Sequence, residues 1–180
     1  MSFSYETKNE LCRLPVQKLC CARAEAYGIL LYCNTFSATE VRVITENPNF
    51  AERLPKLFRR AFGLSFDRQP DKEQTEGKRI FQITDPRKLN HIINVLGYDP
   101  QQNLVLHINF AFMEEACDQA AFLRGAFFAG GSITDPQKRY HLELTTSHLQ
   151  VSREIESLLV ECGYPPKSLS RNGSSITYFK

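Results

Sequence analysis

The sequence has no long run of apolar residues. Its longest uninterrupted stretch, residues 29–33, is far shorter than the about 20 residues that a membrane-crossing helix needs. The first six residues, MSFSYE, also lack the positively charged and then apolar pattern of a secretion signal, which argues against secretion. We therefore expect a cytoplasmic protein without a transmembrane helix.

The sequence also lacks a strong excess of either charge. Its 22 Lys and Arg residues face 20 Asp and Glu residues, which leaves a net charge of +2. Such a small charge permits a nucleic-acid partner without demanding one. Hydrophobic residues make up 42% and charged residues 23%, values that exclude a wholly disordered chain. The 180 residues suffice for one large domain or two small lobes.

Metal-binding spacings are absent from the cysteines and histidines. No two cysteines are separated by two residues, as they are in a zinc knuckle, and Cys20 and Cys21 are adjacent. Several of the six cysteines fall on apolar helical faces, where a free thiol behaves as a small hydrophobic group. The four histidines are scattered along the chain. We expect reduced thiols within the core, no metal site and no cofactor.

Apolar periodicity and capping residues predict alternating helices and strands, an α/β (α+β) fold class. We expect helices at residues 4–13, 17–33, 50–62, 85–97, 112–129 and 148–162. Strands are expected at 40–45, 64–69, 78–84 and 140–146, with a final hairpin that turns at 171–173. Asn47 and Gly63 are expected to cap the helix between them, and Gly130-Gly131 to form another helix C-cap.

The order of elements repeats once along the chain. An offset of 97 residues carries Gly28 onto Gly125, and it also carries Cys20 and Ala24 onto identical residues. We therefore divide the chain into a first repeat at 1–97, a connector at 98–111 and a second repeat at 112–180. Lys180 aligns with the residue just before the last helix of the first repeat. The second repeat is thus expected to lack that helix, as in a fragment.

The segment FLRGAFFAGGSI at residues 122–133 resembles the LAGLIDADG helix of homing endonucleases, and AYGILLYCN at 26–34 is its poorer partner. Glycines at Gly28 and Gly125 let two such helices approach backbone to backbone. The resemblance implies a pseudo-twofold duplicated LAGLIDADG-like fold, whose two antiparallel sheets form a saddle for DNA. Active enzymes end each motif in an acidic metal ligand, but here those positions are Cys33 and Gly130. Because Mg²⁺ prefers oxygen ligands, we expect no nuclease activity.

A closer resemblance is to the WhiA family of bacterial regulators of sporulation and cell division. It rests on LCCARAE at residues 19–25, on residues 122–136 and on YHLEL at 140–144. It implies a DNA-binding transcriptional regulator associated with the nucleoid, of which this chain is the inactive LAGLIDADG-like domain. Family members bind double-stranded DNA mainly through a C-terminal helix-turn-helix, which this sequence does not contain.

Basic residues cluster on the expected strands and turns, where they are either solvated or in contact with DNA. The candidates for DNA contact are Arg42, Arg68, Lys78, Arg79, Lys138, Arg139, Lys167 and Arg171. Acidic neighbours at Glu40, Asp67 and Glu143 dilute this charge, which predicts weak, salt-sensitive binding by the domain alone. The alternative is a protein-interaction scaffold that kept the fold without DNA contact. A saddle dominated by those acids would favour the scaffold.

Overall fold

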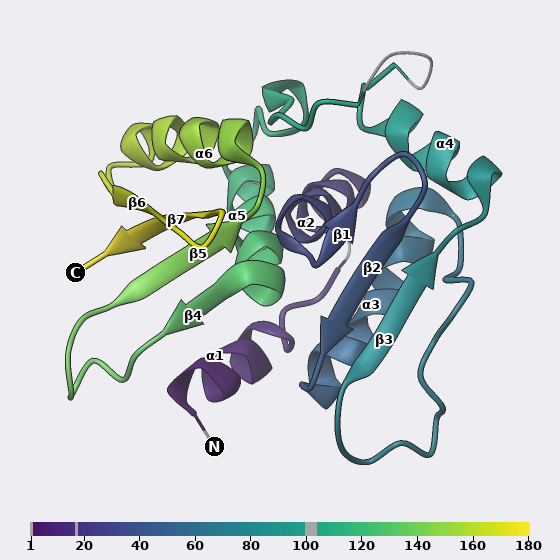
Figure 1. Ribbon diagram of the computed structural model, residues 1–180, viewed down its shortest axis with the longest axis horizontal. Coiled ribbons are helices and arrows are strands. Elements are labelled where there is room, and N and C mark those ends of the chain that lie inside the picture. Colours follow the sequence, from purple (N-terminus) through teal and green to yellow (C-terminus); the bar gives the residue numbers. More distant parts are fainter. Residues whose placement is uncertain (1, 17, 100–103) are drawn as a thin grey trace.

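Two α/β halves lie on either side of a central pair of helices, α2 (Leu19–Tyr32) and α5 (Ala116–Gly130) (Figure 1). The structure is a computed structural model and describes residues 2–16, 18–99 and 104–180. The predicted helix start at Gln17 and the connector residues 100–103 lie outside the described residues.

The first half holds a three-stranded antiparallel sheet in the order β1-β2-β3. Its elements are α1 (Phe3–Leu11), α2, β1 (Thr35–Phe36), β2 (Val41–Thr45), α3 (Pro48–Phe62), β3 (Arg79–Ile83) and α4 (Pro86–Val95). Val41 and Val43 point into the core, as their alternation predicts. Figure 1 shows α3 behind β2 and β3, so the opposite face of this sheet is left open.

The second half holds a four-stranded antiparallel sheet in the order β4-β5-β7-β6. After the short 3₁₀ helix η1 (Phe110–Phe112) come α5, β4 (Gly131–Ile133), β5 (Leu142–Thr146), α6 (Leu149–Glu161), β6 (Lys167–Arg171) and β7 (Ser174–Phe179). Asn172 and Gly173 have φ of 52° and 79°, the backbone that a two-residue hairpin turn needs. The predicted final hairpin is confirmed.

The boundaries of α3 follow from its capping residues. The side chain of Asn47 accepts hydrogen bonds from the backbone N–H groups of Asn49 and Phe50. Pro48 occupies the first turn, where no backbone donor is needed. Gly63 ends the helix with φ of 68°, a left-handed conformation that glycine adopts without steric cost. Both predicted caps are confirmed.

Helices α2 and α5 touch through their backbones at two equivalent glycines. A Cβ atom on Gly28 would lie 2.2 Å from the carbonyl oxygen of Phe122, and one on Gly125 would lie 2.0 Å from that of Glu25. Since Glu25 and Phe122 are themselves 97 positions apart, the two contacts are the same contact related by the pseudo-twofold axis. Only glycine permits this approach, as the resemblance to a LAGLIDADG helix pair implies.

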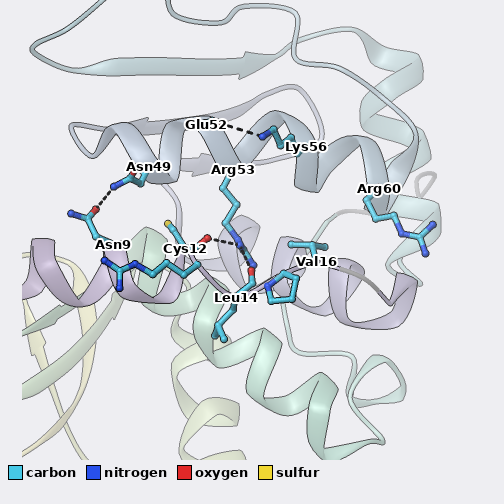
Figure 2. A pocket seen from close by; sticks show the side chains of 11 residues that line it. Asn9, Cys12, Leu14, Val16, Asn49, Glu52, Arg53, Lys56 and Arg60 are labelled. Atoms are coloured by element: carbon cyan, nitrogen blue, oxygen red, sulfur yellow. Dashed lines mark hydrogen bonds and ion pairs between the residues drawn. The ribbon is translucent and has the colours of Figure 1, made fainter.

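A buried ionic network joins α3 to the two central helices, α2 and α5. Glu25 on α2 is fully buried and accepts two hydrogen bonds from Arg53 on α3, at 2.8 and 2.9 Å. Arg124 on α5 donates to the same carboxylate at 2.5 Å. Arg53 also donates to the carbonyls of Cys12 and Leu14, in a hollow beside α3 that Figure 2 shows. Arg53 thus holds the segment that follows α1 against α3.

One predicted strand is wrong. Residues 64–69 form no strand and meet β3 through one bridge, between Arg68 and Gln82. The predicted C-cap at Gly130-Gly131 is confirmed: α5 ends at Gly130, and Gly131, with φ of −97° and ψ of 154°, caps the helix in an extended conformation and begins β4 directly. The two glycines also permit close packing. A Cβ on Gly131 would lie 2.3 Å from the ring of Phe127, and one on Gly130 would lie 2.5 Å from the carbonyl oxygen of Thr145.

Three helix starts also shift. The first helix begins at Phe3 and is capped by Ser2, not by Ser4, because the Ser2 hydroxyl accepts from the backbone of Tyr5. Helix α5 begins at Ala116 and not at residue 112, which lies in η1. Helix α2 begins at Leu19. Apolar spacing continues through such neighbouring turns, so periodicity alone misplaces the first turn.

Candidate nucleic-acid interface

The first open face is the uncovered side of the β1-β2-β3 sheet, with Thr35, Arg42, Ile44, Ile80 and Gln82 on its strands. Arg42 lies directly between Thr35 and Gln82 in the register, and its Nη2 donates to the Thr35 hydroxyl at 3.3 Å. Among the described residues the buried Nε of Arg42 has no hydrogen-bond partner. Because this Nε is buried, contact between Arg42 and a ligand on this face would fall to its terminal guanidinium nitrogens.

Arg68 joins the first open face from the segment beside β3. Its guanidinium donates to the Gln82 side-chain oxygen at 3.3 Å, while the Gln82 amide donates to Glu40 at 2.7 Å. The chain of contacts from Arg68 through Gln82 to Glu40 crosses the sheet. It holds one cation and one anion in place across the strands.

The second open face belongs to the β4-β5-β7-β6 sheet and is defined by Glu143, Thr145, Ile176, Tyr178, Lys167, Leu169 and Arg171. Thr177 points the other way, since it is buried and meets Ser152 of α6. Its strand neighbours Ile176 and Tyr178 therefore lie on the opposite side, where Ile176 is itself only 3% exposed, and their register partners on β6 are Leu169 and Lys167. Every residue of β6 is exposed.

The acid of the second open face, Glu143, has a side-chain partner. Nε2 of His141 lies 2.9 Å from a carboxylate oxygen of Glu143, and the His141 ring stacks on Tyr178 with centroids 5.9 Å apart. Lys167 and Arg171 have no side-chain hydrogen bond within the described part of the chain. The two basic side chains at the edge of this sheet are therefore available to a partner.

Arg79 is a correction to the predicted set of DNA contacts. It points to the core side of β3 and is only 6% exposed. Its guanidinium donates to the backbone carbonyls of Glu46, Gln74 and Gly77, which holds the loop before β3. With its donors turned inward, Arg79 is not available to a phosphate.

The remaining candidates lie at the tips of the connecting turns. Lys78 is exposed immediately before β3. Lys138 and Arg139 are exposed in the turn between β4 and β5, where both backbone N–H groups donate to the carbonyl of Asp135. These residues frame the two open faces but do not lie on them.

The two positions that the resemblance aligns with the endonuclease acids, Cys33 and Gly130, hold no carboxylate. Cys33 follows α2, and its thiol donates to the carbonyls of Leu30 and Thr35 at 3.3 Å each. Burial of that thiol raises its pKa to about 12, so it stays neutral. Gly130 ends α5 without room for any side chain, as the contact with Thr145 shows. These residues do not fit a Mg²⁺ ion, which needs oxygen ligands.

Comparisons with known proteins agree with this arrangement. A family model described as the WhiA LAGLIDADG-like domain matches residues 119–180. A probable cell division protein WhiA from Ruminiclostridium cellulolyticum is 33% identical over 189 residues, covering all of this chain and 60% of the relative. One from Alkaliphilus metalliredigens is 30% identical and is 61% covered. The chain is thus similar to WhiA proteins over its whole length, and its residues 119–180 match the model of their LAGLIDADG-like domain.

Solved structures place WhiA and the homing endonucleases on one fold. The crystal structure of an N-terminal LAGLIDADG domain of DUF199/WhiA matches with a TM-score of 0.73 at 17% identity, covering 99% of this chain and 86% of that one. Full-length DUF199/WhiA from Thermatoga maritima gives 0.72 at 18% identity, covering 100% and 57%. I-DmoI in complex with DNA and Mn gives 0.62 at 11% identity, covering 91% of each chain. The predicted LAGLIDADG fold with two antiparallel sheets is confirmed.

Two further observations concern the length of the chain and its helices. The chain spans about 60% of the length of the curated WhiA relatives that it matches. Within residues 2–16, 18–99 and 104–180, no helix combines the length and apolar character needed to cross a bilayer.

Sequence reasoning missed two groups of residues. It assigned no role to the charge of Glu25, which is the centre of the buried ionic network. It also treated the cysteines as core thiols, although Cys20 and Cys117 are exposed. The offset of 97 residues that pairs Cys20 with Cys117 was the available signal, because residues related by the pseudo-twofold axis near a tight helix pair lie close together.

Proposed function

We propose that this chain is a DNA-contacting, non-cleaving domain of a bacterial transcription regulator that acts in cell division and sporulation. Its contact with double-stranded DNA is made by the two open faces, through Arg42, Arg68, Lys167 and Arg171. The protein would act in the cytoplasm, at the nucleoid. Family membership supports the process, and the open faces support the contact.

The proposal rests on how the basic side chains of the two open faces are placed and on which groups they contact. Arg42 is held on the first face by the Thr35 hydroxyl, and Lys167 and Arg171 project from an exposed edge strand. The acids are engaged: Glu40 with Gln82, and Glu143 with His141. Asp67 accepts from Lys88 at 2.7 Å, away from the strands. Glu40 and Glu143 keep their negative charge, but the four basic side chains of the two faces outnumber them, which favours phosphate contact over the scaffold.

The absence of cleavage follows from chemistry at the ends of the helix pair. Cleavage in this fold uses two carboxylates that hold divalent ions. A neutral thiol at Cys33 and a bare backbone at Gly130 offer no such ligands. DNA bound on the open faces would thus be held and released intact.

Binding to a mixed-sequence duplex, measured against salt concentration, tests this proposal. Each lost phosphate contact lowers the slope of log affinity against log salt by about one unit. Arg42→Ala and Arg171→Ala should each do so. Arg59→Ala is the matched control, since Arg59 is exposed on α3, which covers the opposite side of the first sheet. Equal slopes for all four proteins would contradict DNA contact by these faces.

The second candidate, a protein-interaction scaffold, has one observation in its favour. An apolar hollow lies between α1, α5 and the second sheet, lined by residues that include Leu11, Leu123, Phe127, Leu142 and Phe179. Substituting Leu123 with Asp would abolish a protein contact made there and leave the salt slope for DNA unchanged. A chain that shows no salt-dependent DNA binding, but loses a partner protein on this substitution, would be a scaffold.

A further inference from the structure

Four potential metal ligands meet at the N-terminal ends of α2 and α5. They are Cys20 and Cys21 from α2, and Cys117 and Asp118 from α5. The offset of 97 residues carries Cys20 onto Cys117 and Cys21 onto Asp118, so the group straddles the pseudo-twofold axis. It lies at the opposite ends of the helices from Cys33 and Gly130, where endonucleases of this fold hold their ions.

The ligand atoms already lie close together. The three sulfur atoms and a carboxylate oxygen of Asp118 are all within 4.8 Å of one another. Cys21 Sγ donates to Asp118 Oδ1 at 3.5 Å, and Cys117 Sγ does so at 3.9 Å. In a tetrahedral zinc site with Zn–S bonds of about 2.3 Å, neighbouring sulfur atoms are about 3.8 Å apart. A contraction of about 1 Å or less would therefore complete the site.

Asp118 gives an independent reason to expect a cation. Asp118 is only 5% exposed. Within the described residues, its side chain accepts hydrogen bonds from thiols alone, and no Lys or Arg lies at ion-pair distance from it. A buried carboxylate is costly unless it is paired with a cation or coordinates a metal. Thiols are weak hydrogen-bond donors and do not supply that charge.

Thiols coordinate a divalent ion as thiolates, because the charge of the metal deprotonates a coordinating thiol.

We propose that Cys20, Cys21, Cys117 and Asp118 bind one Zn²⁺ ion, which ties α2 to α5 across the pseudo-twofold axis. Three sulfur ligands and one oxygen ligand suit zinc and disfavour Mg²⁺ or Ca²⁺. On binding, each coordinating thiol releases its proton to solvent, and the ion pairs with the Asp118 carboxylate. Cys20 and Cys117 are exposed, so the ion has a path of entry.

Zinc binding is measured on the 180-residue chain, kept reduced, by competition with a chromophoric chelator. Co²⁺ serves as a spectroscopic probe of tetrahedral thiolate ligation. We expect one ion per chain and thiolate-to-cobalt charge-transfer absorption. Cys117→Ser and Asp118→Asn should each weaken zinc binding by at least about tenfold, since even loss of a ligand's outer-shell partner costs 10–100-fold. Cys12→Ser is the matched control and should bind zinc normally.

A thermal melt provides a second readout that does not depend on the chelator. Saturating zinc should raise the melting temperature of the parent chain and of Cys12→Ser, but not that of Cys117→Ser or Asp118→Asn. Circular dichroism of each apo variant checks that it is folded. The proposal is overturned if the parent binds zinc no better than Cys117→Ser, or if Cys12→Ser loses as much. It is also overturned if the cluster only forms a disulfide on oxidation and takes no zinc when reduced.

Discussion

The two open faces carry similar charge in different ways. On the first face, Arg42 and Arg68 are held by Thr35 and Gln82, so their guanidinium groups are pre-positioned. On the second, Lys167 and Arg171 project from the exposed edge strand β6 without side-chain hydrogen bonds in the described part of the chain. Pre-positioned groups lose less conformational freedom on binding. If DNA binds as proposed, the first face would fix its position and the second would adapt to it.

The repeats also differ where the fold's metal site would be. In the first repeat, Cys33 follows the central helix and carries a thiol side chain. In the second repeat the central helix ends at Gly130, where the neighbouring strand leaves no room for a Cβ. The pseudo-twofold axis therefore preserves the helix contact at Gly28 and Gly125 but not the chemistry at the helix ends. What the two repeats share is therefore the close packing of their central helices.

The largest effect is expected from breaking the shared helix contact. Gly125→Leu would place a side chain against the backbone of Glu25, which cannot move aside, and overpacking of this kind costs about 3 kcal/mol or more. Gly28→Leu should be equally harmful, because its contact with Phe122 is equivalent. Urea denaturation measures both. A folded Gly125→Leu protein with an unchanged midpoint would contradict the symmetric helix pair.

A loss of about the same size is expected at the buried ionic network. Glu25→Gln removes the only anion shared by Arg53 and Arg124 and leaves their charges uncompensated in and near the core, at a cost of about 3–5 kcal/mol. The control is Glu52→Gln, whose carboxylate is 72% exposed and pairs only with Lys56. That change should cost under about 0.5 kcal/mol. Similar unfolding free energies for the two variants would rule out a structural role for the network.

Arg79→Ala separates a structural arginine from a DNA-contacting one. Loss of its hydrogen bonds to three backbone carbonyls should lower stability by about 1–3 kcal/mol without altering the salt dependence of DNA binding. Arg68→Ala should show the reverse, since Arg68 is exposed and bonded only to Gln82. Unfolding midpoints and salt titrations of both variants check this. An Arg79→Ala chain with a reduced salt slope would return Arg79 to the interface.

The smallest and most informative difference is between the two faces themselves. Arg42→Ala and Arg171→Ala should lower the salt slope equally, by about one unit each. Arg42→Ala should weaken affinity more, because its guanidinium is already held by Thr35. Titrations at a single salt concentration compare the two affinities. A larger loss from Arg171→Ala would invert the assignment of the pre-positioned face.

Local signals in the sequence predicted much of the fold. Asn47 and Gly63 marked the ends of α3, and the shared spacing of Gly28 and Gly125 predicted the central contact. What depends on tertiary structure was not predictable from those signals. Arg79 and Arg42 both lie on strands, and only the strand register shows that Arg79 points inward. The gathering of Cys20, Cys21 and Asp118 likewise depends on how closely α2 and α5 approach.

The central claim is that the two open faces hold DNA without cutting it. Its most direct test compares the parent chain with a variant in which Arg42, Arg68, Lys167 and Arg171 are all alanine, using a duplex titrated against salt in the presence of Mg²⁺. We predict that the parent binds and leaves the duplex intact, and that the variant's salt slope falls by about four units, with its fold retained. An unchanged slope in the variant, or cleavage of the duplex by the parent chain, would contradict the account.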